Sequence, residues 1–163
     1  MPRVFIAADH TGFLLKETLI EYIRDGLSYA VEDMGAFELN PTDDYPDMVR
    51  PCVEKVVATP DSLGIVIGGS GQGEAMVANR VQGARCALYY GQAQATHAID
   101  AEGAPALDGY DIVRLSREHN NANVLSLAAR FITEEDAKEA VRIFLEFTFT
   151  GQERHQRRIT KLH

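Results

Sequence analysis

With 163 residues, 45% of them hydrophobic, the chain is predicted to fold as one domain over residues 1–163 and to bury about two-thirds of the surface that it exposes when unfolded. Its formal net charge of -8 argues against nucleic acid as a partner, because phosphate backbones are bound by broad basic faces. The sequence has neither an apolar run long enough for a bilayer nor an N-terminal secretory signal, so a cytoplasmic protein with no membrane partner is expected.

The first part of the chain predicts a strand, a polar turn and a helix. The apolar run at residues 4–8 is typical of a strand, and it ends at Asp9 and His10. A helix is expected over residues 11–24, where apolar residues recur at four-residue spacing. A weak second strand is expected over residues 30–34.

A polar loop through Tyr45 and Pro46 leads to the next predicted helix. This helix carries the apolar residues Val49, Val53, Val56 and Val57. Pro51 is tolerable only in the first turn of this helix, because proline lacks the backbone N–H that a helix interior uses. The continuous apolar run at residues 63–67 predicts a strand that is covered on both faces.

A glycine-rich turn at residues 68–73 follows that strand and opens a helix predicted over residues 74–81. A strand over residues 84–90, a stretch of ambiguous structure over residues 91–118 and a strand over residues 124–128 come next. The last predicted helix covers residues 134–147, with Thr133 and Asp136 spaced as a helix-starting cap. Its expected buried stripe is Ala137, Val141, Phe144 and Leu145.

Strands that alternate with amphipathic helices predict an α/β fold: a Rossmann-like parallel sheet of about five strands with helices on both faces, plus a C-terminal helix. Ligands of such sheets bind at the carboxyl ends of the strands. We therefore expect Asp9, His10, the glycine-rich turn and the residues beyond Tyr90 to lie together on that edge.

The glycine-rich turn has two interpretations. A turn of this kind between a buried strand and a helix allows several backbone amides to point inward, where they stabilise a negative oxygen. The alternative is a tight connection without a ligand. A dinucleotide fingerprint is not indicated, because the spacing Gly69-x-Gly71-x-Gly73 differs from the one that such sites require.

Glu74 directly follows the glycine-rich turn and lies at the start of the predicted helix, where the helix dipole favours an ionised carboxylate. A solvated capping residue is one interpretation. A catalytic base is the other, because a carboxylate beside an amide-lined oxyanion site is what the removal of a proton next to a carbonyl needs. Ser70 is placed to hydrogen-bond the same oxygen.

Two histidines and three arginines complete the candidate residues. His10 and His119 lie at predicted boundaries of strands and loops, where either a structural or a catalytic role is open. Arg154 and Arg158 share a helix face in the basic C-terminal segment, which is either a solvated tail or a fork for one phosphate group. Arg130, after the strand at residues 124–128, is a third candidate phosphate ligand.

Motifs along the whole chain together resemble those of the type B ribose-5-phosphate isomerases, a family that also includes galactose-6-phosphate and allose-6-phosphate isomerases. They are Ala8-Asp9-His10-Thr11-Gly12-Phe13-x-x-Lys16, Asp44-Tyr45-Pro46, Gly68-Gly69-Ser70-Gly71-Gln72-Gly73-Glu74, Ala78-Asn79-Arg80, Arg117-Glu118-His119-Asn120-Asn121 and Arg154-His155-Gln156-x-Arg158. Many members use a cysteine thiolate just before the glycine loop, where this chain has Gly69. The chain resembles the branch that carries a glutamate after the loop.

The resemblance implies the role of each candidate. Glu74 is the expected base, Asp9 and His119 assist opening of the sugar ring, and His119 acts as the proton donor. The enediolate would be held by Gly69, Ser70, Gly71, Gln72, Gly73 and Asn120. The phosphate would be held by His10, Arg130, Arg154 and Arg158, with Tyr45 against the sugar.

No metal and no organic cofactor is expected. Cys52 and Cys86 fall in apolar stretches, where small buried residues are the ordinary expectation, and they indicate neither a disulfide nor a zinc site. The expected substrate is a sugar phosphate, ribose 5-phosphate or alternatively a six-carbon aldose phosphate such as allose or galactose 6-phosphate. A non-catalytic phosphosugar-binding module is the alternative outside the enzymes.

The resemblance further implies a homodimer whose subunits share each site, so that the basic C-terminal residues serve the neighbouring subunit's glycine loop. Whether two such dimers pair further into a tetramer is left open. The segment at residues 91–108 is longer than the family usually has there. Two interpretations of this segment are left open: it forms a lid over the pocket, or it adds to the subunit interface.

Overall fold

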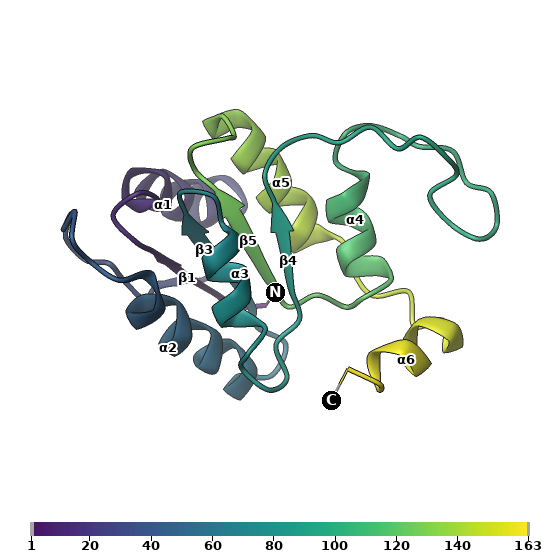
Figure 1. Cartoon of the computed structure of the whole chain (residues 1–163), viewed down its shortest axis with the longest axis horizontal. Helices are drawn as coiled ribbons and strands as arrows, with labels where there is room; N and C mark the ends of the chain where they lie inside the picture. The colour runs from purple at the N-terminus through teal and green to yellow at the C-terminus, as the bar shows by residue number, and fades with distance from the viewer. Residues whose placement is uncertain (1, 163) are drawn as a thin grey trace.

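The computed structural model of the chain describes residues 2–162, which form a five-stranded parallel sheet with the strand order β2-β1-β3-β5-β4 (Figure 1). The strands are β1 (Val4–Ala8), β2 (Val31–Asp33), β3 (Leu63–Gly68), β4 (Cys86–Tyr89) and β5 (Val124–Ala128). Every residue of β1, β3 and β5 is buried, as expected of apolar strands that are covered on both faces. The predicted α/β sheet is confirmed.

Helices cover both faces of this sheet (Figure 1). They are α1 (Phe13–Glu21), which continues into the π-helical turn η1 (Tyr22–Gly26), α2 (Tyr45–Ala58), α3 (Gln72–Ala78), α4 (Asp111–Glu118), α5 (Glu134–Glu146) and α6 (Glu153–Ile159). One core cluster joins α1, α4 and α5 to the sheet, and a second joins α2 and α3 to its other face. Among residues 2–162, no helix has the length and apolar character to cross a bilayer.

The start and the buried stripe of α5 follow the sequence pattern. Thr133 precedes the helix in extended conformation, and its hydroxyl accepts a hydrogen bond of 3.1 Å from the backbone N–H of Asp136. The stripe predicted for this helix is buried: Ala137, Val141, Phe144 and Leu145. The cap satisfies one of the N–H groups that a helix start leaves without an internal partner.

One expectation for the helices is wrong, and two features go beyond what the sequence pattern predicted. Pro51 lies in the interior of α2, not in its first turn, because the helix already begins at Tyr45. Pro51 is exposed, so the backbone carbonyl that it leaves without a donor lies on the solvent side of the helix. Val57 is 39% exposed and does not belong to the buried face. Part of the ambiguous stretch, residues 111–118, forms α4.

The strand order places the candidate residues at a point where the direction of winding reverses. From β1 the chain adds β2 on one side, then crosses back to add β3 on the other. Between the carboxyl ends of β1 and β3 the following loops diverge, and ligands of open α/β sheets bind in that crevice. Asp9 and His10 follow β1, and the glycine-rich turn follows β3.

Candidate functional site

Glu74 lies inside the site and is only 4% exposed. A Cβ atom built on Gly68 would come within 1.9 Å of Glu74 Oε1 and 2.0 Å of its Cδ. The carboxylate therefore packs directly on the backbone of Gly68, in space that any other residue would fill. The turn that brings it there depends on Gly71, whose φ of +69° is in the left-handed region that favours glycine.

Burial raises the pKa of Glu74, and the negative charge of Asp9 acts in the same direction. A hydrogen bond from the backbone of Glu74 lowers the pKa, but its effect is smaller than that of burial. Desolvation thus acts against the ionised form that the helix dipole favours. A carboxylate with a raised pKa is a stronger base than a solvated one.

The backbone of the glycine-rich turn is held through its carbonyl groups. Ser126 Oγ donates to the carbonyl of Gly71 at 2.6 Å, and the amides of Ala129 and Arg130 donate to the carbonyls of Gly68 and Gly69 at 2.8 and 3.1 Å. In contrast, the amides of residues 69–71 donate no hydrogen bond within the described part of the chain. An anchored loop with free amides has the features of an anion-binding site.

Ser70 and Gln72 interact with each other inside the turn. The backbone N–H of Gln72 donates to Ser70 Oγ at 3.4 Å, which is a long hydrogen bond. The Ser70 hydroxyl keeps its own proton for donation to another group. This leaves the interaction expected of Ser70, with a substrate oxygen, available.

Asp9 is buried at the end of β1, and its carboxylate organises the following turn. Its Oδ1 accepts hydrogen bonds from the amide of Thr11 at 2.9 Å, the hydroxyl of Thr11 at 2.5 Å and the amide of Gly12 at 3.2 Å. Because the three donors all converge on Oδ1, the second oxygen of the same carboxylate is free of them. A fixed carboxylate with one oxygen available suits a positioned proton acceptor.

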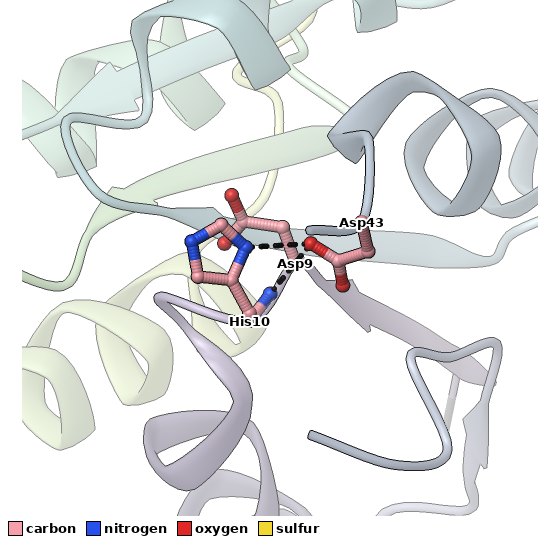
Figure 2. Close-up of side chains that lie close together, drawn as sticks. All are labelled: Asp9, His10 and Asp43. Atoms are coloured by element: carbon pink, nitrogen blue, oxygen red, sulfur yellow. Dashed lines mark hydrogen bonds and ion pairs between the residues drawn. The ribbon is translucent and has the colours of Figure 1, made fainter. Parts of the chain in front are cut away.

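His10 is held by Asp43, as Figure 2 shows. Asp43 Oδ1 lies 2.6 Å from His10 Nδ1 and accepts a second hydrogen bond of 3.2 Å from the backbone N–H of His10. The bond at Nδ1 leaves Nε2 on the far side of the ring free. Asp43 Oδ2 is buried without a hydrogen-bond partner among the described residues and points away from the histidine (Figure 2).

Asp9, His10 and Asp43 each offer a potential ligand atom within 4.8 Å of the other two. Such a group has the spacing of a three-ligand cation site. However, His10 and Asp43 bond to one another, and Asp9 Oδ1 is taken up by Thr11 and Gly12. At least one ligand atom of each residue is therefore already engaged by a partner within the chain.

Tyr45 and Arg130 lie against the glycine-rich turn from two sides. A Cβ on Gly73 would come within 2.6 Å of the Tyr45 ring, and one on Gly69 would come within 3.4 Å of Arg130 Nε. The Tyr45 ring thus packs closely on Gly73, and Arg130 lies beside Gly69. Their expected contacts with the sugar and the phosphate stay predictions.

His119 and Asn120 do not join this group, and the expectation that the residues beyond Tyr90 share one edge is wrong for them. The helix α4 runs from beside Tyr89 back across the sheet, and His119 follows its last residue. Asn120 precedes β5, which is parallel to its neighbours. Both residues therefore lie at the amino edge, about 17 Å from the glycine-rich turn if β5 rises by about 3.3 Å per residue.

The basic C-terminal residues lie near His119, not near the turn of the same chain. The rings of His119 and His155 stack with centroids 4.1 Å apart and planes inclined by 15°. Arg154 donates two hydrogen bonds to Glu102, at 2.5 and 2.7 Å, and Arg158 lies one turn further along α6. The candidates thus form two groups within one chain, at opposite edges of the sheet.

Two residues of the site are missed by sequence reasoning. Gly68 was noted only as part of the glycine-rich turn, whereas the structure shows that it provides the space for the Glu74 carboxylate. Asp43 holds His10 from 33 positions away in a loop, and no local pattern marks it. Its role depends on how that loop folds over the end of β1.

Comparison with known proteins gives a consistent result over the whole chain. The family model described as Ribose/Galactose Isomerase matches residues 4–108 and 103–162, two matches that meet within the long segment before α4. A ribose-5-phosphate isomerase B of Mycolicibacterium paratuberculosis is 38% identical over 157 residues, covering 96% of this chain and 87% of the relative. A probable ribose-5-phosphate isomerase B of Mycoplasma genitalium is 38% identical, covering 98% and 93%.

Solved structures agree with these sequence relatives. The crystal structure of the Mycoplasma genitalium ribose-5-phosphate isomerase B with bound ribulose-5-phosphate superposes with a TM-score of 0.83, at 36% identity and over 98% of this chain and 93% of the other. The type B ribose 5-phosphate isomerase of Trypanosoma brucei gives a TM-score of 0.83 at 29% identity, over 99% and 97%.

Proposed function

Because this chain belongs to the Ribose/Galactose Isomerase family, we propose that it is an aldose–ketose isomerase that interconverts ribose 5-phosphate and ribulose 5-phosphate through an enediolate, with Glu74 as the base. The observation that carries the proposal is the place of the Glu74 carboxylate, buried on Gly68 beside the free amides of the turn. A base and an oxyanion site side by side are the two parts that enolisation requires.

The proton transfer proceeds at two adjacent carbons. Glu74 takes the proton from C2 of the open-chain aldose, the electron pair of the broken C–H bond forms a C1–C2 double bond, and the carbonyl oxygen O1 becomes negative. The amides of the turn and the Ser70 hydroxyl stabilise that oxygen. Glu74 then returns the proton to C1, while the proton of the C2 hydroxyl moves to O1, which leaves the ketone at C2.

Ring opening precedes this step and involves Asp9 and His119. His119 donates a proton to the ring oxygen, and Asp9 accepts the proton of the C1 hydroxyl as the carbonyl forms. The Mycoplasma genitalium relative binds ribulose 5-phosphate, and in the proposed mechanism His10 and Arg130 of this chain contact the phosphate. Tyr45 packs at the sugar.

The separation of the two groups of residues supports a site that is shared between subunits. Within one chain, Glu74 lies at one edge of the sheet, whereas His119, Arg154 and Arg158 lie at the opposite edge. In a homodimer, His119, Asn120, Arg154 and Arg158 of one subunit complete the pocket around Glu74 of the other. A single chain would hold only half of the groups that the reaction uses.

The test is Glu74→Gln, which keeps the shape of the side chain and removes the base. Turnover of ribose 5-phosphate should fall by about 100- to 10,000-fold, the usual contribution of a general base, while substrate still binds. Exchange of the C2 proton of the substrate with deuterated solvent should be lost in the same proportion. Unchanged turnover in Glu74→Gln would exclude Glu74 as the base. If the wild-type protein exchanged the C2 proton of no sugar phosphate with solvent, a non-catalytic binding module would be indicated instead.

The preferred sugar is tested by comparing kcat/KM for ribose 5-phosphate with the values for allose and galactose 6-phosphate. The relatives named above are ribose-5-phosphate isomerases, which favours the five-carbon sugar. A higher kcat/KM for a six-carbon phosphate would transfer the same mechanism to that substrate.

A further inference from the structure

The imidazole ring of His155 is a buried group for which the mechanism above has no use. It lies on α6, is 5% exposed, and stacks face to face on His119 with ring centroids 4.1 Å apart. Within residues 2–162 the His119 ring makes no side-chain hydrogen bond, although its backbone N–H caps α4 by donating to Leu115. The stack is therefore the contact that orients the His119 ring.

Arg154 fixes the hydrogen-bonding state of His155. Its Nε donates to His155 Nε2 at 3.3 Å, so Nε2 is an acceptor and the ring proton is on Nδ1. His119, Arg154 and Arg158 place further positive charge around this ring, and the negative charge of Glu102 opposes them with a smaller effect. Burial and these charges lower the pKa of His155, which favours its neutral form.

We propose, on the basis of the function proposed above, that His155 is a positioning residue for the proton donor His119. A stacked ring fixes the plane of its neighbour through the ring faces and leaves both nitrogens of His119 free at the ring edge. One of them can then reach the ring oxygen of a sugar in the neighbouring subunit's pocket. A neutral His155 also tolerates a protonated His119, because the face of an uncharged aromatic ring attracts a cation.

The same ring joins the proton donor to a phosphate ligand. His155 contacts His119 through its face and Arg154 through Nε2, so the two candidate site residues are held on one unit. Misplacement of a catalytic group by about 1 Å can cost about 100-fold in rate. Loss of the stack should therefore affect the step in which His119 acts, and not the proton transfer at Glu74.

Two substrates separate these steps. Ribose 5-phosphate is mostly a closed furanose ring and needs ring opening, whereas ribulose 5-phosphate cannot form that ring, because its C5 oxygen is esterified. Turnover of ribose 5-phosphate therefore reports ring opening and proton transfer together. Exchange of the C1 protons of ribulose 5-phosphate with deuterated solvent, followed by NMR, reports the proton transfer alone.

The variants are His155→Gln, which keeps an acceptor for Arg154 but loses the ring, and His155→Phe, which keeps a stacking ring but loses the acceptor. In His155→Gln, turnover of saturating ribose 5-phosphate should fall by about 10- to 100-fold, with exchange into ribulose 5-phosphate within about twofold of wild type. His155→Phe should retain most of the turnover. Thermal melting and light scattering on both variants check folding and assembly.

Three outcomes would overturn the proposal: equal loss of turnover and exchange in both variants, wild-type turnover in His155→Gln, or rescue by Gln instead of Phe. Equal loss would give His155 a purely structural role. Failure of the proposed isomerase function is a separate result, because wild-type protein would then show no exchange into ribulose 5-phosphate at all.

Discussion

Gly68→Ala tests the position of the Glu74 carboxylate without touching the base itself. The added methyl group would lie 1.9 Å from Oε1 and 2.0 Å from Cδ of Glu74, far inside van der Waals contact. Because a carbon and an oxygen approach to roughly 3.2 Å, the carboxylate must move by more than about 1 Å. The fold should tolerate this, since the displaced atoms are the end of a flexible side chain.

A displacement of this size is expected to lower kcat by about 100-fold, because the base no longer meets the substrate carbon at the productive distance. The melting temperature should change little, since an alanine in place of glycine also restricts the unfolded chain. The two effects together distinguish a misplaced base from a damaged fold.

Gly69→Ala is the matched control in the same loop. There the added methyl group would meet its nearest neighbours, Arg130 and Thr11, at 3.4 Å, which is ordinary contact, and the backbone φ is not in the left-handed region. We expect less than about a tenfold loss of kcat from this smaller perturbation. Steady-state assays on the two variants, with circular dichroism as a check of folding, would refute the reasoning if Gly68→Ala retained wild-type kcat or if both variants lost activity equally.

Three further predictions concern charge. Because burial raises the pKa of Glu74 above its ordinary 4.5, the folded state holds this proton more tightly than the unfolded state, and stability falls as pH rises from about 4.5 through the folded pKa. Glu74→Gln should thus gain in melting temperature relative to wild type across that window, and a constant difference at all pH values would contradict this. Arg158→Ala should raise KM by about 10- to 100-fold, the effect of losing a charged hydrogen bond, with a smaller change in kcat; an unchanged KM would remove it from the phosphate site. Glu102→Gln should lower KM by up to about fivefold, because it frees Arg154 from an exposed ion pair worth about 1 kcal/mol or less, whereas a raised KM would mean that Glu102 holds Arg154 in place for the phosphate.

The sequence determined the elements whose signals are local. The apolar runs of β1, β3 and β5 and the Thr133 cap of α5 depend on neighbouring residues alone, and their positions are confirmed. The order of a glycine-rich turn followed by Glu74 is equally local, and it led to the proposal of Glu74 as the base. Periodicity and cap chemistry operate over a few residues, so they are visible without the fold.

Helix α4 was not visible because its buried face is largely polar. Asp111, Ser116 and Arg117 are buried there. The Arg117 guanidinium is satisfied by the backbone carbonyls of Ala122, in the loop that follows α4, and of Phe147, which follows α5. A pattern search looks for apolar residues, and only the folded chain supplies the acceptors that allow a charged residue into this face.

The position of His119 followed from the same helix. Once residues 111–118 return the chain from the carboxyl edge of the sheet, the residues before a parallel strand must lie at its amino edge. Long-range contacts likewise decided that the Glu74 carboxylate packs on Gly68 and that Asp43 holds His10. Chain order specifies which residues are available, but the distance between two side chains from different elements is set by how the elements pack.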